Sequence, residues 1–116
     1  MAHFTIKEKQ MFDELDFLFY HSPHIDALAK IIDGNMPNCS LRSIEMCVRN
    51  HSQYVATKNQ YGMKYFDIFR RHKPFTYHYD TGKSIQTSLA QLNMLRFIFD
   101  QFTSDEIEND LHIVLN

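Results

Sequence analysis

The chain has no tryptophan, three glycines, three prolines and two cysteines among its 116 residues. Two cysteines, Cys39 and Cys47, are too few for a disulfide scaffold, so we expect free thiols and a reducing compartment. So few glycines also exclude a glycine-rich phosphate loop. No stretch approaches the ~18 apolar residues of a membrane span, and the N-terminal residues lack the apolar core of a signal peptide. The sequence therefore predicts a protein that is not secreted and does not enter membranes.

Apolar and aromatic residues are abundant. The hydrophobic fraction is 44%, with ten Phe and six Tyr, which is typical of a globular chain and excludes a disordered one. A chain of this length builds one modest core. We therefore expect a single domain spanning residues 1–116.

The charges are unevenly placed, although the formal net charge is only −2. Residues 41–83 contain eight Lys/Arg and three Asp/Glu. The flanking residues 1–40 contain three Lys/Arg and six Asp/Glu, and residues 84–116 contain one Lys/Arg and five Asp/Glu. A basic middle between acidic ends indicates a charged binding partner or self-association.

Apolar residues at helical spacing predict about five helices. The first covers residues 6–20 behind a Thr5–Glu8 capping box. The second begins at Ser22-Pro23 and stops at Gly34, and the third runs unbroken from Ser40 to about residue 59, with His51 on its apolar stripe. The fourth opens with a Ser88–Gln91 capping box and ends at Phe102, and a short last helix follows Thr103.

Residues 64–102 are the stretch around which the chain is organised. A short helix or turn packed by Tyr65, Phe66, Ile68 and Phe69 precedes the cluster Arg70-Arg71-His72-Lys73. Aromatic residues then alternate over 75–79, a Gly82 turn follows, and 84–87 is the return strand. Because two strands alone are marginally stable, the hairpin must lie on the helices. The fold class predicted is α+β, mostly α, with one β-hairpin.

Two motifs in this stretch resemble a small protein family of nucleocytoplasmic large DNA viruses. The first is a Phe-Asp-Pro-Phe-Cys-Arg-Arg type element, matched by Phe66, Asp67, Phe69 and Arg71. The second is a Thr-Thr-x-Gly-Gln-Leu-Asn type helix start, matched by Thr87, Gln91, Leu92 and Asn93. Ile68, Arg70 and Ala90 depart from the pattern, so this chain would be a divergent member. The resemblance covers about a third of the chain and implies a viral origin, in the host cytoplasm, host nucleus or virion, without implying an activity.

The sequence gives no catalytic or metal signature. His21, His24, Cys39 and Cys47 are ligand types that zinc uses, but their spacing fits no standard finger. A Cys–His catalytic pair is not specific in a chain with seven His, and acidic neighbours such as Asp13 and Glu14 point to different helix faces. We expect no enzyme activity, no metal and no cofactor.

The candidate nucleic-acid-binding residues are Arg70, Arg71, Lys73, Tyr77 and Lys83. Cations neutralise phosphates, and aromatic faces stack unpaired bases. Alternating aromatics on a strand are, however, the usual pattern of a face that packs on a core. These residues predict association with nucleic acid, and the resemblance implies that the protein is a viral accessory or virion protein. The alternative is a structural packing protein, capsid-associated or self-assembling, whose basic middle meets the acidic ends of a neighbour.

Overall fold

The computed structural model describes residues 3–20, 25–35, 40–69 and 72–101. Within them the fold is α+β and mostly helical, as predicted, with five α-helices, one short 3-10 helix and a two-stranded antiparallel hairpin. The elements in chain order are α1 (Ile6–Tyr20), α2 (Ile25–Asp33), α3 (Leu41–Val48), α4 (Ser52–Tyr61), η1 (Met63–Tyr65), β1 (Phe75–Asp80), β2 (Lys83–Thr87) and α5 (Leu89–Gln101). The predicted last helix lies outside the described residues. No helix in the described ranges is long and apolar enough to cross a membrane.

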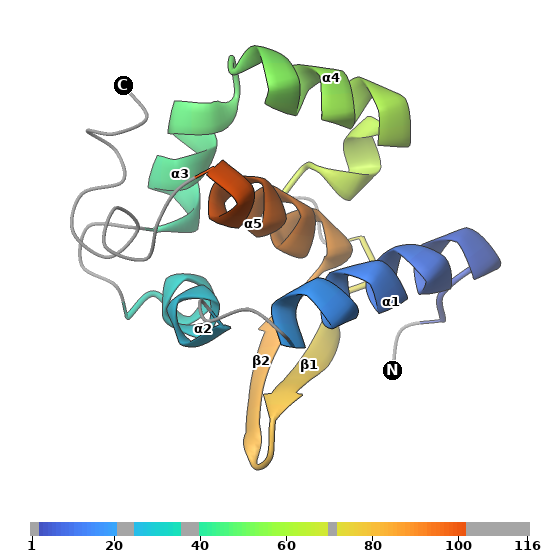
Figure 1. Ribbon diagram of the computed structural model, residues 1–116, viewed down its shortest axis with the longest axis vertical. Helices are drawn as coiled ribbons and strands as arrows, with labels where there is room; N and C mark the ends of the chain where they lie inside the picture. Colours follow the sequence, from blue (N-terminus) through green and yellow to red (C-terminus); the bar gives the residue numbers. More distant parts are fainter. Residues whose placement is uncertain (1–2, 21–24, 36–39, 70–71, 102–116) are drawn as a thin grey trace.

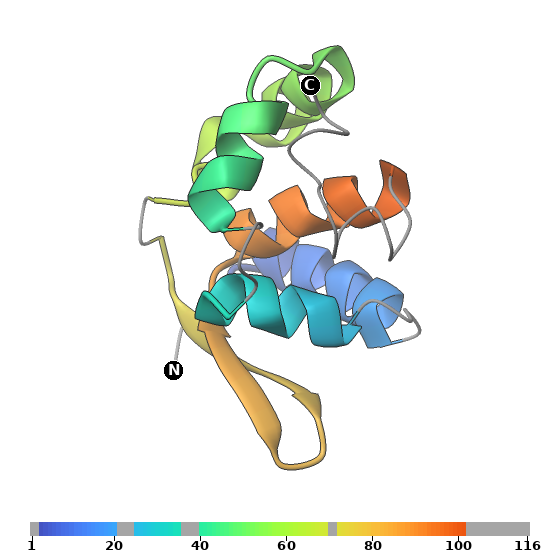
Figure 2. The ribbon, with the colours of Figure 1, turned by 90° about the vertical axis from the view of Figure 1, so that its left-hand side faces the viewer.

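Helix α5 lies between the other helices (Figures 1 and 2). In Figure 2, α3 and α4 form the upper level, α1 and α2 the lower level, and the hairpin projects below them. The side chains of α5 are apolar over more than half of its circumference, as the sequence predicts, and its fully buried residues are Leu92, Met94, Leu95 and Ile98. This helix therefore packs against both levels and forms the centre of the core.

The ends of the helices follow their local sequence signals. Thr5 and Glu8 form the predicted capping box, in which each side chain accepts a hydrogen bond from the other residue's backbone N–H. Helix α2 stops at Gly34, whose φ of 76° is a conformation that glycine adopts without steric cost. The Ser88–Gln91 box is confirmed in one direction, since the Ser88 hydroxyl accepts from the Gln91 N–H.

The prediction of one unbroken helix from Ser40 to residue 59 is wrong, because the chain turns at residues 49–51 and makes two helices. His51 is extended (φ −69°, ψ 127°) and becomes the N-cap of α4. The polar neighbours Asn50 and Ser52 favour such a boundary, since their side chains compete with helical hydrogen bonds. The turn places His51 in solvent and buries Tyr54 instead.

The hairpin packs on α1 through its aromatic face. Its register places Tyr77 opposite Ile85, and both side chains are buried. The Phe12 ring of α1 meets Phe75 and Tyr77 edge to face, with centroids 5.4 and 5.8 Å apart. The Tyr77 hydroxyl donates to Asp16 Oδ1 at 2.8 Å. The predicted strands at 75–79 and 84–87 are confirmed within one residue at their inner ends, and their aromatic face packs on the core.

Candidate functional site

The segment that enters the hairpin is tied to a buried carboxylate. Glu8 lies on the first turn of α1 with only 1% of its surface exposed. Its Oε1 accepts from the Thr5 N–H at 2.8 Å and from Lys73 Nζ at 2.5 Å. Its Oε2 accepts from the Tyr65 hydroxyl at 3.2 Å and lies 3.0 Å from His72 Nε2. Four groups from three parts of the chain thus meet at one side chain.

These contacts keep Glu8 ionised. Burial by itself would raise the pKa of the carboxyl, but the hydrogen bonds from Lys73, Thr5, His72 and Tyr65 outweigh it and hold the pKa well below the ordinary value. In the same cluster, burial and then the nearby Glu8 charge raise the pKa of the Tyr65 hydroxyl. The phenol therefore remains a hydrogen-bond donor to Glu8.

Lys73 takes a conformation that is uncommon for a residue with a side chain. Its φ is +52°, in the left-handed region, and it directly precedes Pro74. The ion pair with Glu8 holds Lys73 in this position, at the point where the chain enters β1. The strained residue and the buried anion therefore fix the start of the hairpin together.

The predicted binding residues have different environments. Tyr77 is 2% exposed and hydrogen-bonded to Asp16, so its ring cannot stack on a base, and burial corrects that prediction. Lys73 pairs with Glu8, which places its charge inside the protein's own structure. Lys83 is exposed on β2 opposite Asp80. Arg70 and Arg71 lie outside the described residues.

A different aromatic side chain is exposed beside the basic residues. Phe69 was expected to pack inward, but 52% of its surface is exposed. The guanidinium of Arg42, from α3, lies 4.9 Å from the centre of the Phe69 ring. Because Arg42 and Phe69 are far apart in sequence and on different elements, no local pattern in the sequence indicates that they pair. This contact arises only from the packing of α3 against the segment after η1.

Residues 40–69, which we call the basic unit, contain further cations. Lys64 lies 5.1 Å from the Tyr65 ring centre, and Arg49 pairs with Glu45 within α3 and the turn that follows it. Arg49 and Lys58 line a groove of about 160 Å³ together with Glu45, Asp67, Met63 and Phe69, so this groove is formally neutral. The unit contains four Lys/Arg against two Asp/Glu. Helices α1 and α2 form the opposite level. Residues 5–35, which include them, contain three Lys/Arg against six Asp/Glu. We call this level the acidic layer.

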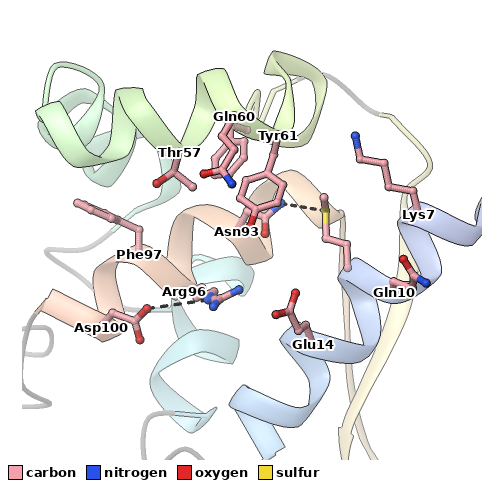
Figure 3. A pocket seen from close by; sticks show the side chains of 12 residues that line it. Lys7, Gln10, Glu14, Thr57, Gln60, Tyr61, Asn93, Arg96, Phe97 and Asp100 are labelled. Carbon is pink, nitrogen blue, oxygen red and sulfur yellow. Dashed lines mark hydrogen bonds and ion pairs between the residues drawn. The ribbon is translucent and has the colours of Figure 1, made fainter.

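A larger groove of about 400 Å³ opens between α1, α4 and α5 (Figure 3). Tyr61 points into it from α4, Gln10 and Glu14 face it from α1, and Arg96 faces it from α5. Its lining carries two cations and two anions, namely Lys7, Arg96, Glu14 and Asp100. Arg96 and Asp100 are themselves paired at 3.9 Å. The groove is thus formally neutral.

Asn93 forms part of the wall of this groove and is 92% buried, with 8% of its surface exposed. Its Nδ2 donates to the Tyr65 carbonyl oxygen at 2.9 Å and contacts Met11 Sδ at 3.3 Å. A carbonyl oxygen accepts only, so this bond fixes which end of the amide is nitrogen. Sequence reasoning identified Asn93 only as part of a resemblance, because both its partners are distant in sequence.

The two histidines and two cysteines that form the candidate zinc set lie largely outside the described residues. His21, His24 and Cys39 lie outside the described residues, as does the side chain of Cys47. Among the residues that are described, no group of three or more His, Cys, Asp or Glu side chains could hold a metal ion.

Comparison of the chain with protein-family models, with curated proteins and with solved structures finds no match. The resemblance to a viral family therefore stays a prediction.

Proposed function

We propose that this protein is a non-enzymatic accessory or virion protein of a large DNA virus that binds the phosphate backbone of nucleic acid. The proposed binding residues are the cations of the basic unit and Arg70 and Arg71, which follow it in the sequence. The observation that carries the proposal is the exposed Arg42–Phe69 pair, whose Phe69 directly precedes those two arginines in the sequence. The host cytoplasm, nucleus or virion is the corresponding location.

The geometry of the pair suits a phosphate ligand. The cation–π contact of Arg42 with the Phe69 ring uses none of the guanidinium N–H groups in a hydrogen bond to a protein acceptor. No described residue forms an ion pair with Arg42, and Lys64 likewise has no described carboxylate within ion-pair distance. Both side chains can therefore meet a phosphate without losing a bond inside the protein.

The exposed Phe69 ring adds a surface for an unpaired base. Aromatic faces stack on any base, so such contacts are tolerant of sequence. This assigns to Phe69 the stacking role that the sequence suggested for Tyr77. Single-stranded nucleic acid is therefore expected to bind at least as well as a duplex.

The test is the salt dependence of binding. Fluorescence anisotropy with a labelled single strand and a duplex, at several salt concentrations, gives the slope of log affinity against log salt. The Arg70→Ala/Arg71→Ala double variant should make this slope shallower by about 0.7–0.9 per lost phosphate contact. Lys9→Ala/Lys30→Ala removes two cations from the acidic layer and is the matched control. Equal slopes for all three proteins would contradict the proposal.

The second candidate function is structural packing, in which the basic unit of one copy meets the acidic layer of another or of another viral protein. The observation in its favour is the presence of exposed apolar side chains, Met46, Met63 and Phe69, among the cations. An assembly through these side chains would tolerate salt. Size-exclusion chromatography with and without a short duplex separates the two functions, since packing predicts a large species without nucleic acid.

A further inference from the structure

We propose that the groove between α1, α4 and α5 binds a nucleobase that carries an exocyclic amino group. The base comes either from a free nucleoside or from an unpaired position of a strand. The inference rests on the proposed function only for the second of these sources. The groove is separate from the exposed Arg42–Phe69 pair, because neither residue contributes to its lining.

The groove contains a buried hydrogen-bond acceptor without a donor. Both N–H groups of the Asn93 amide are engaged, one by the Tyr65 carbonyl and the other by Met11 Sδ. Within the described chain, no group donates to its Oδ1. A buried acceptor that lacks a donor costs free energy, so a ligand that donates an N–H there gains the full benefit of the bond.

The walls of the groove suit a flat and neutral molecule. Tyr61 extends into it with 39% of its surface exposed, and such a ring offers a stacking face. The amides of Gln10 and Gln60 can each donate and accept along the edge of a planar ligand. The two cations and two anions of the lining cancel, which favours an uncharged base over a phosphate.

The size of the groove agrees with this ligand class. About 400 Å³ lies within the range of small-molecule sites, roughly 300–1,000 Å³. Adenine and cytosine present an amino donor on the edge that pairs in a duplex, whereas hypoxanthine and uracil present a carbonyl acceptor at the same place. An acceptor such as Asn93 Oδ1 therefore distinguishes adenosine from inosine.

The experiment is a titration of the isotope-labelled full chain, followed by backbone amide chemical shifts. Adenosine should give saturable shifts at the residues that line the groove on α4 and α5. The affinity for inosine should be lower by about tenfold or more, because the inosine carbonyl faces another acceptor. Equal affinities for adenosine and inosine would overturn the assignment of Asn93.

Two tryptophan substitutions on neighbouring positions of α1 provide the structural control. Gln10→Trp fills the groove from an exposed position and should abolish the adenosine shifts. Lys9→Trp adds the same side chain at an exposed residue outside the groove lining and should leave them intact. Unchanged adenosine binding by Gln10→Trp would overturn the proposed location.

A short oligo(dA) separates the two sources of the base. Shifts in the groove with oligo(dA) but not with adenosine assign the ligand to a strand. Shifts with both ligands show that the groove binds the base from either source. Adenosine binding without any oligonucleotide binding supports the groove and removes the proposed function. Oligonucleotide shifts confined to the basic unit, with none from adenosine, support the proposed function and overturn the groove. No saturable shift with either ligand overturns both.

Discussion

Lys73 and Arg42 both belong to the basic middle of the chain, but they face different partners. Lys73 meets the carboxylate of Glu8, which is 1% exposed, and its own side chain is 30% exposed. Arg42 is exposed and lies on the half-exposed ring of Phe69. The burial of the partner thus decides the role: a cation on a buried anion holds the fold, and a cation on an exposed ring remains available to a ligand. A count of charges in the sequence includes both cations and therefore does not distinguish their two roles.

The largest expected effect concerns α5, the helix that lies between the two levels. Leu95 of α5 is fully buried, so Leu95→Ala should lower the free energy of unfolding by roughly 2–5 kcal/mol, through lost contacts and the cavity left behind. Met63→Ala, at a residue that is 67% exposed, is the control and should change it little. Urea denaturation of both variants measures the difference. A Leu95→Ala protein as stable as the parent would place α5 outside the core.

The next effect tests the Glu8 cluster against an exposed carboxylate of the same helix. Glu8→Gln keeps the shape but replaces one carboxylate oxygen by an NH2 group, which then faces either the Lys73 and Thr5 donors or the His72 and Tyr65 contacts. It should cost roughly 1.5–3 kcal/mol of unfolding free energy. Asp13 pairs with Lys9 in solvent, with side-chain exposures of 58% and 62%. Asp13→Asn should therefore cost below about 1 kcal/mol. Similar losses from the two variants would show that burial does not distinguish these carboxylates.

The pH dependence of stability gives a third test of the same cluster. The pKa of Glu8 is lowered in the folded protein from an ordinary value of 4.5. A lowered pKa stabilises the folded state fully above 4.5 and loses this contribution as the pH falls toward the folded pKa. The stability difference between the parent and Glu8→Gln should therefore be constant near neutral pH and shrink below about pH 4.5. Thermal melts of both proteins from pH 7 to pH 3 measure it, and a difference that grows in acid would contradict the lowered pKa.

The elements predicted well from sequence are those whose signals are local. Helix α1 has a capping box and a helical stripe within its own residues, and the hairpin has alternation plus a glycine with φ of 71° at Gly82. The break at His51 was missed because the apolar stripe continues across it, and the burial of Tyr54 shows that tertiary packing decided the outcome.

The candidate sites were less predictable because they depend on contacts between distant parts of the chain. The residues next to Glu8 in the sequence predict a helix cap. They do not indicate that its carboxylate also contacts the side chains of Lys73 and His72. Asn93 likewise meets Tyr65 and Met11 only after α1 and η1 have packed on α5. The basic middle can be counted in the sequence, but the sequence does not separate the cations that the fold uses from those that it leaves exposed.

The smallest expected effect on stability distinguishes the two cations most directly. Lys73→Ala removes the shortest bond to Glu8 and should lower the free energy of unfolding by about 1–2 kcal/mol. It should leave the salt dependence of nucleic-acid binding unchanged. Arg42→Ala removes an exposed side chain and should cost below about 0.5 kcal/mol. It should make the slope of log affinity against log salt shallower by about 0.7–0.9, since one phosphate contact is lost.

Each of these two variants is the control for the other, because both lose one positive charge from the basic middle. Urea denaturation gives the stability arm, and anisotropy titrations of a labelled single strand at several salt concentrations give the binding arm. A shallower slope for Lys73→Ala with an unchanged slope for Arg42→Ala would reverse the two roles. The pairing with Glu8 would then be weaker than a phosphate contact, and burial of the partner would no longer explain which cations the fold retains.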